Sequence, residues 1–200
     1  MKIQLTEKMK PYSGVIYFMV ILLAAHFFWK LFVIGDESNE YVSFFGMNIS
    51  APFIFMAQHI ARLTHSLLDW IGYNITLYPD NVLRHAISQN GVWIVWSCTG
   101  IKQAYIFFCI IAFYRGPWQH KLWYIPAGLV FIYLFNIFRI ALITIIIDKY
   151  PEQFEMWHEH ILKYAFYAMI FVLWAFWSDQ FGTSPKPKRI RNNNDAAEIS

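Results

Sequence analysis

The feature that most limits the fold of this chain is a series of long apolar segments separated by polar ones. The first runs from 14 to 34, and others cover 100–114, 122–147 and 161–177. About 20 apolar residues in a helix are enough to cross the hydrocarbon core of a bilayer. Only 14% of the residues are charged, against about 25% in a typical soluble domain. The pattern predicts an all-α integral membrane protein, a bundle of about four transmembrane helices.

Residues 52–71 follow a helical period but are too polar to be a transmembrane span. One face carries apolar side chains that include Phe53, Ala57 and Ile60, and the opposite face carries polar ones such as Arg62 and Asp69. An amphipathic helix of this kind lies in the membrane interface or lines a cavity inside a bundle. We expect it on the outer side of the membrane. Turn signals follow it, and short strands are predicted near 74–77 and 92–96.

The charges at the ends of the spans predict the orientation of the chain. Three basic groups flank the spans: Lys2, Lys8 and Lys10; Arg115 and Lys121; and Lys186, Lys188, Arg189 and Arg191. Placing all three on the cytoplasmic side satisfies the positive-inside rule. The acidic segments 35–97 and 148–160 then face outward. We expect a membrane domain over 1–181 and a disordered basic cytoplasmic tail over 182–200. The first apolar run is too long for a signal-peptide core, so it predicts an uncleaved span.

The segment Trp96-Ser97-Cys98-Thr99-Gly100 stands where the polar region gives way to the apolar helix predicted over 100–114. The N-terminus of a helix favours an anion, and Lys102 follows Cys98 by one helical turn. Both effects lower a thiol pKa and raise the thiolate fraction, which is the nucleophilic form. The alternative is that Cys98 is a small apolar residue in the core. Cys109 is about 16 Å farther along the same predicted helix, too far for a disulfide.

Other polar residues lie inside or next to the later spans. Arg139 is an arginine within an apolar run, with Asn136 one turn earlier on the same helix face. An intramembrane arginine is costly unless it is paired or hydrated, so it marks either a structural contact or a functional site. Asn136 would hold the guanidinium in place. His158 and His160 precede the last span, and neighbouring carboxylates would orient one of them as a general base. Two histidines at this spacing point to different faces of a helix, which argues against joint metal binding.

The order Cys98-Thr99-Gly100, then Asn136-x-x-Arg139, then His158-Glu159 before a final span resembles the exosortase/archaeosortase family. The resemblance covers about 72–178. It implies a multi-pass membrane cysteine transpeptidase, with Cys98 as nucleophile, Arg139 as substrate or oxyanion stabiliser and His158 as base. His160 is the second candidate for the base, and Lys102 and Asn136 are supporting residues. A glycine common after the family's histidine is absent, because Leu162 and Lys163 stand there.

The resemblance implies that the substrates are membrane-anchored proteins with a C-terminal sorting signal, which consists of a short motif, a hydrophobic helix and a basic end. It places the chain in a bacterial inner membrane with the active site facing the periplasm. We expect no cofactor, no metal ion and no nucleic-acid partner. Two alternatives are a catalytically inactive membrane assembly or export factor, and a small transporter with Arg139 and the two histidines in a polar path. The transporter has too few spans unless the chain oligomerises.

Overall fold

The computed structural model describes residues 12–36 and 40–182. The helices are α2 (Ser13–Phe32), α3 (Ser50–Ile71), α4 (Ile101–Phe113), α5 (Trp118–Lys149) and α6 (Leu162–Phe181). Two short 3₁₀ helices, η2 (Trp96–Thr99) and η3 (Pro151–Gln153), and a π-helical turn, η4 (Met156–Ile161), lie between them. The strands are β1 (Val33–Asp36), β2 (Tyr41–Phe44), β3 (Met47–Asn48), β4 (Ile75–Leu77), β5 (Val82–His85) and β6 (Gly91–Trp93). Most of the predicted tail, 182–200, and the N-terminal lysines lie outside the described residues.

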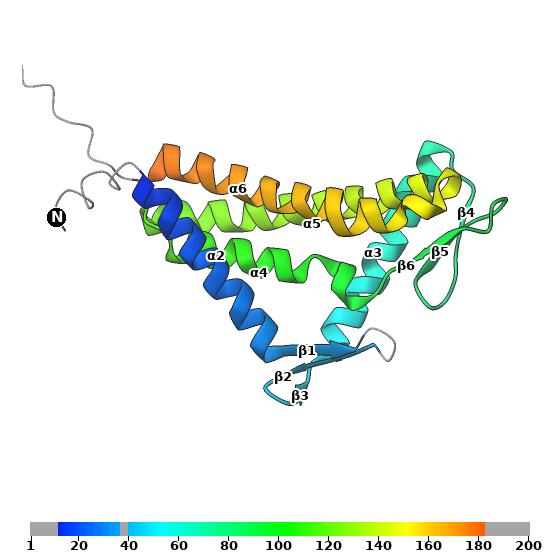
Figure 1. Ribbon diagram of the computed structural model, residues 1–200, viewed down its shortest axis with the longest axis horizontal. Helices are drawn as coiled ribbons and strands as arrows, with labels where there is room; N and C mark the ends of the chain where they lie inside the picture. The colour runs from blue at the N-terminus through cyan, green and yellow to red at the C-terminus, as the bar shows by residue number, and fades with distance from the viewer. Residues whose placement is uncertain (1–11, 37–39, 183–200) are drawn as a thin grey trace, which may run out of the picture.

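The centre of the protein is a bundle in which α4, α5 and α6 run side by side while α2 crosses them obliquely (Figure 1). Among the described residues, three helical segments are long and apolar enough to cross a membrane: α2, α5 and 151–181. The fourth, α4, is an apolar helix of 13 residues, which corresponds to about 20 Å of helix and is less than the bilayer core. It packs against α2, α5 and α6. The predicted α-helical membrane protein with about four bundle helices is confirmed.

Small residues and buried hydrogen bonds join the bundle helices. Gly128 of α5 is buried, and a Cβ atom there would overlap the Phe107 ring of α4. Glycine thus permits the close α4–α5 approach that is common between transmembrane helices. At the end of α4, Lys121 is buried and donates hydrogen bonds of 2.7 Å to the carbonyls of Ala112 and Tyr114. This lysine, which the charge pattern assigned only to orientation, also caps the C-terminus of α4.

Two small antiparallel sheets lie away from the start of α2 and the end of α6. Figure 1 shows the first sheet at the end of α2, beside the bundle, and the second sheet near α3 at the far end of the bundle. Their strand orders are β1-β2-β3 and β4-β5-β6. The strands expected near 74–77 and 92–96 correspond to β4 and β6. Strand β5 and the whole first sheet were not predicted, and the first span ends at Phe32 rather than 34. These strands contain two to four residues each, too few for an alternating pattern to stand out from the flanking sequence.

The second sheet is attached to the end of α5 by polar contacts. Nε2 of buried His85 lies 2.7 Å from the carbonyl oxygen of Thr144. Ser88 donates to the Asp148 carboxylate at 2.6 Å, and the Asn90 amide donates to the Ile147 carbonyl at 3.1 Å. The carbonyl oxygens at the C-terminus of a helix lack intrahelical partners, so side chains that donate to them complete the helix end. The sheet is therefore held at a defined position beside α5.

Helix α3 is the amphipathic helix that the sequence predicts. It buries Phe53, Ala57, Ile60 and Leu68, whereas Arg62 on the other face is exposed. Its buried face packs against α5, η2 and β4. Within the described residues, α3 is not among the helices apolar enough to cross a membrane. Through its contact with η2 it supports the turn that carries Cys98.

Candidate active site

A pocket with a volume of about 890 Å³ lies where the second sheet, α4, α5 and the start of α6 meet. One wall is the strand segment 90–95, continued by Ser97 and Cys98. The others come from the start of α4 with Lys102, from α5 with Arg139, and from the 151–167 region with His158. A pocket of this size is within the range of ligand sites in proteins. It brings the predicted Cys98, Arg139, His158 and Lys102 together from separate segments of the chain.

Cys98 is half-buried in the 3₁₀ turn η2, immediately before α4. Its backbone N–H donates to the Val95 carbonyl at 3.0 Å, and its carbonyl accepts a hydrogen bond of 2.8 Å from the Asn136 side chain. Two hydrogen bonds therefore fix the backbone that carries the thiol. The sequence predicted that Cys98 and Cys109 share one helix, which is wrong, because α4 begins only at Ile101.

Gly100 ends this turn in the left-handed conformation, with φ of 75°. A side chain at this φ is strained, and a Cβ atom would lie 3.1 Å from Cγ of Asn136. Glycine thus allows the chain to reverse direction between Cys98 and α4 while Asn136 packs directly beneath it. The residues that follow Cys98 therefore stabilise the turn that carries it. The Thr99 hydroxyl donates a hydrogen bond of 2.7 Å to the Trp96 carbonyl, and Gly100 adopts the left-handed conformation that ends the turn.

Asn136 has a different contact from the one predicted. It is fully buried on α5, and its Nδ2 donates to the Cys98 carbonyl, while its Oδ1 has no hydrogen-bond partner among the described residues. The amide oxygen therefore does not accept from the Arg139 guanidinium. The expectation that Asn136 holds Arg139 in place is wrong, because its side chain reaches across to η2. Asn136 instead links α5, which carries Arg139, to the turn that carries Cys98.

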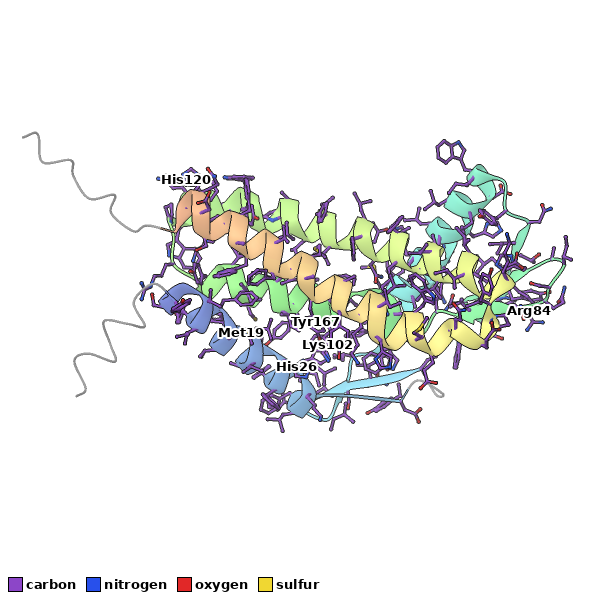
Figure 2. All side chains as sticks on the ribbon, turned by 45° about the horizontal axis from the view of Figure 1, so that its top comes forward. Met19, His26, Arg84, Lys102, His120 and Tyr167 are labelled. Atoms are coloured by element: carbon purple, nitrogen blue, oxygen red, sulfur yellow. The ribbon has the colours of Figure 1, made fainter. Side chains whose placement is uncertain are left out.

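Lys102 shares the pocket with Cys98, but not for the reason the sequence suggested. The left-handed Gly100 breaks the helix between them, so the one-turn spacing on a single helix face does not apply. Lys102 lies near other cations, because the charges of Lys30 and Lys163 act on it and its own charge acts on His26. Figure 2 shows Lys102 between His26 of α2 and Tyr167 of α6. The α4 side of the pocket is thus electropositive, which favours an anionic species there.

Arg139 lies on the bundle-facing side of α5 and is 7% exposed, yet it lines the pocket. Burial among apolar helices keeps the guanidinium charge out of bulk water. Its electrostatic interactions are therefore stronger than they would be in water. Ile140 and Ile143 of the same helix contribute apolar surface to the pocket beside it. The pocket therefore combines a fixed positive charge with a largely apolar wall.

The structure separates the two histidines. His158 lines the pocket, and its ring stacks on Phe154 with centroids 5.2 Å apart and an interplanar angle of 10°. His160 is exposed and is not among the pocket residues. Both belong to the π-helical turn η4. Glu155 lines the pocket as well, whereas the side chain of Glu159 lies outside what the structure describes.

Several pocket residues were not predicted as site residues. They are Gln103 of α4, Glu155, Lys163 and Tyr167 near the start of α6, and the strand segment 90–95. Lys163 had a sequence signal, because a lysine two residues into an apolar span is unusual. The strand segment 90–95 had no such sequence signal, because it lines the pocket only through the packing of the second sheet against α5. Within the described residues, His, Cys, Asp and Glu side chains form no cluster of three that could hold a metal ion.

A family model described as transmembrane exosortase matches residues 40–176. The matched range begins earlier than the resemblance read from the sequence, so it includes α3 and the first sheet in part as well as the whole pocket. No curated protein and no solved structure matches the chain.

Proposed function

Because this chain belongs to the transmembrane exosortase family, we propose that it is a membrane-embedded cysteine transpeptidase or protease. Its substrates are membrane-anchored proteins with a C-terminal sorting signal of a short motif, a hydrophobic helix and a basic end. The observation that carries the proposal is that one pocket is lined by Cys98, Arg139 and His158. In the proposed mechanism they serve as the nucleophile, the cation that stabilises the oxyanion and the general base.

The proposed reaction has two steps. His158 takes the proton of the Cys98 thiol, and the thiolate attacks the carbonyl carbon of the scissile peptide bond. Arg139 stabilises the oxyanion of the tetrahedral intermediate, and His158 returns the proton to the leaving amine as the C–N bond breaks. The N-terminal part of the substrate is then a thioester on Cys98. An amine or water attacks this thioester and releases the thiol.

A covalent intermediate is the most direct test of this function. A membrane protein with a matching C-terminal signal is produced together with the enzyme, and the mixture is quenched in acid. We expect mass spectrometry to find the N-terminal part of the substrate attached to Cys98. Neutral hydroxylamine should release it, as expected of a thioester, and Cys98→Ala should give no adduct. Cleavage of the substrate without any adduct on Cys98 would show that the thiol is not the nucleophile.

We also propose that the pocket faces the periplasm from a bacterial inner membrane. The basic span ends predict this orientation. The start of α2 and the end of α6 lie together at the end of the bundle away from β6, whose residues line the pocket (Figure 1).

A membrane-impermeant maleimide tests the orientation in intact cells. We expect it to label Cys98, which is half-buried at the pocket, and to leave Cys109 unlabelled, because that side chain is only 7% exposed within the bundle. The Cys98→Ala variant is the control for site assignment. If Cys98 reacts only after the cells are permeabilised, the pocket faces the cytoplasm and the proposed orientation is wrong.

A further inference from the structure

Strand β6 forms one edge of the second sheet and has an open side. The register pairs Leu83 with Val92, and backbone bonds run from His85 N–H to the Asn90 carbonyl and from Ile94 N–H to the Asn81 carbonyl. In an antiparallel ladder, every second residue exchanges its hydrogen bonds with the neighbouring strand. Residues 90, 92 and 94 are therefore bonded to β5. Gly91 and Trp93 point their N–H and C=O groups away from it.

This open side of β6 faces the pocket that contains Cys98. The pocket is lined by each of the consecutive residues from 90 to 95. Successive side chains of a strand alternate between its two faces, so a pocket that touches every residue runs along the edge of the strand. Among the described residues, no other strand pairs with this edge. Pro151, Phe154 and Glu155 line the same pocket.

The edge also leads directly to the proposed nucleophile. After Trp93 the chain continues through Ile94 and Val95, whose carbonyl accepts the hydrogen bond from the Cys98 N–H. The backbone from the open edge to the thiol is thus held in one defined path. A peptide bonded along β6 would have its direction set with respect to Cys98 by the same backbone.

We propose that the peptide processed at Cys98 binds in extended form, as an additional strand on the open edge of β6. This inference rests on the proposed function of the pocket. The N–H and C=O groups of Gly91 and Trp93 would bond to alternate residues of the peptide. Edge strands with unpaired backbone groups are ready templates for such pairing. Main-chain recognition also orders a flexible peptide without demanding a particular side chain at every position.

Proline substitution tests the edge because it removes a single N–H group. Proline is tolerated on an edge strand where its missing N–H would point outward, which is the situation of Trp93. Trp93→Ala removes the exposed indole but keeps the N–H, so the comparison of Trp93→Pro with Trp93→Ala isolates the backbone donor. We expect Trp93→Pro to process substrate about tenfold more slowly than Trp93→Ala, the loss that follows from one hydrogen bond in a water-poor site.

The opposite edge of the same sheet supplies a matched control. In β4 the residue paired with Leu83 is Leu77, and its N–H points away from β5 by the same alternation. Leu77 is not among the residues of the pocket that contains Cys98. We therefore expect Leu77→Pro and Leu77→Ala to process substrate at similar rates. Equal rates for Trp93→Pro and Trp93→Ala, with both proteins present in the membrane, would overturn the inference.

A second measurement does not depend on proline being tolerated. The probe is a set of synthetic peptides that cover the residues before the hydrophobic segment of a processed protein, each with one backbone amide replaced by an ester. Binding is measured to the Cys98→Ala protein, which does not turn them over. Strand addition predicts that affinity falls at every second position. A uniform affinity, or a loss without this period of two, would contradict the proposal.

The outcomes separate this inference from the proposed function. If Cys98→Ala stops processing while the Trp93 variants are alike, the enzyme function stands and strand addition is wrong. If Cys98→Ala processes substrate at the parent rate, the proposed function is wrong, whatever the rates of the Trp93 variants. If Trp93→Pro does not accumulate in the membrane, the ester series decides.

Discussion

Cys98→Ala should abolish processing of a sorted membrane protein while the variant still accumulates in the membrane. Removing the nucleophile of a covalent mechanism typically lowers the rate by at least about 10³-fold. Cys98→Ser should fail as well or nearly so, because a hydroxyl is a much weaker nucleophile than a thiolate. The measurement is the fraction of substrate converted to its shorter form over time, with both proteins quantified in isolated membranes.

The second cysteine supplies the control for the first. Cys109 is buried in the bundle core on α4 and does not line the pocket, so Cys109→Ala removes a thiol without touching the proposed chemistry. We expect its processing rate to stay close to that of the parent. If Cys98→Ala processes substrate at the parent rate, the chain is not a cysteine enzyme. The assembly or export factor then becomes the better description of this family member.

His158→Ala should lower the processing rate by about 10²–10⁴-fold, the usual contribution of a general acid–base group. His160→Ala should leave the rate within about twofold of the parent. The physical reason is position, since His158 lines the pocket and His160 is exposed away from it. The two variants remove the same side chain from the same π-helical turn, so each controls for the effect of the other on folding.

The pH dependence of the rate adds a readout that a structural role of His158 would not change. A general base gives a rate that rises as it loses its proton, and His158→Ala should remove that limb of the profile. A large loss in His160→Ala together with a mild loss in His158→Ala would move the base to His160. Equal and mild losses would mean that neither imidazole takes the proton from Cys98.

Much of the bundle could be predicted from hydrophobic patterning alone. The spans predicted over 122–147 and 161–177 correspond to α5 and α6, and the amphipathic segment 52–71 corresponds to α3. Long periodic segments are the most readable feature of a sequence, because many residues contribute to each one. The short strands were less readable. Strand β5 contains Arg84 and His85, and His85 is buried only because it bonds to Thr144 on a helix 59 residues away in the chain.

The sequence by itself determined that this chain is a helical membrane protein. It marked Arg139 as out of place in an ordinary span, and Cys98, His158 and His160 as candidate reactive groups next to spans. The physical reason is that a polar or charged group in an apolar span costs free energy unless it is paired or hydrated, so such a group indicates a structural or functional role. Only the tertiary structure decided which of these groups share a pocket. It turned Asn136 toward the carbonyl of Cys98, placed His158 in the pocket and His160 outside it, and set the edge of β6 along the same cavity. Those relations depend on how α5 packs against η2 and the second sheet, which no local pattern encodes.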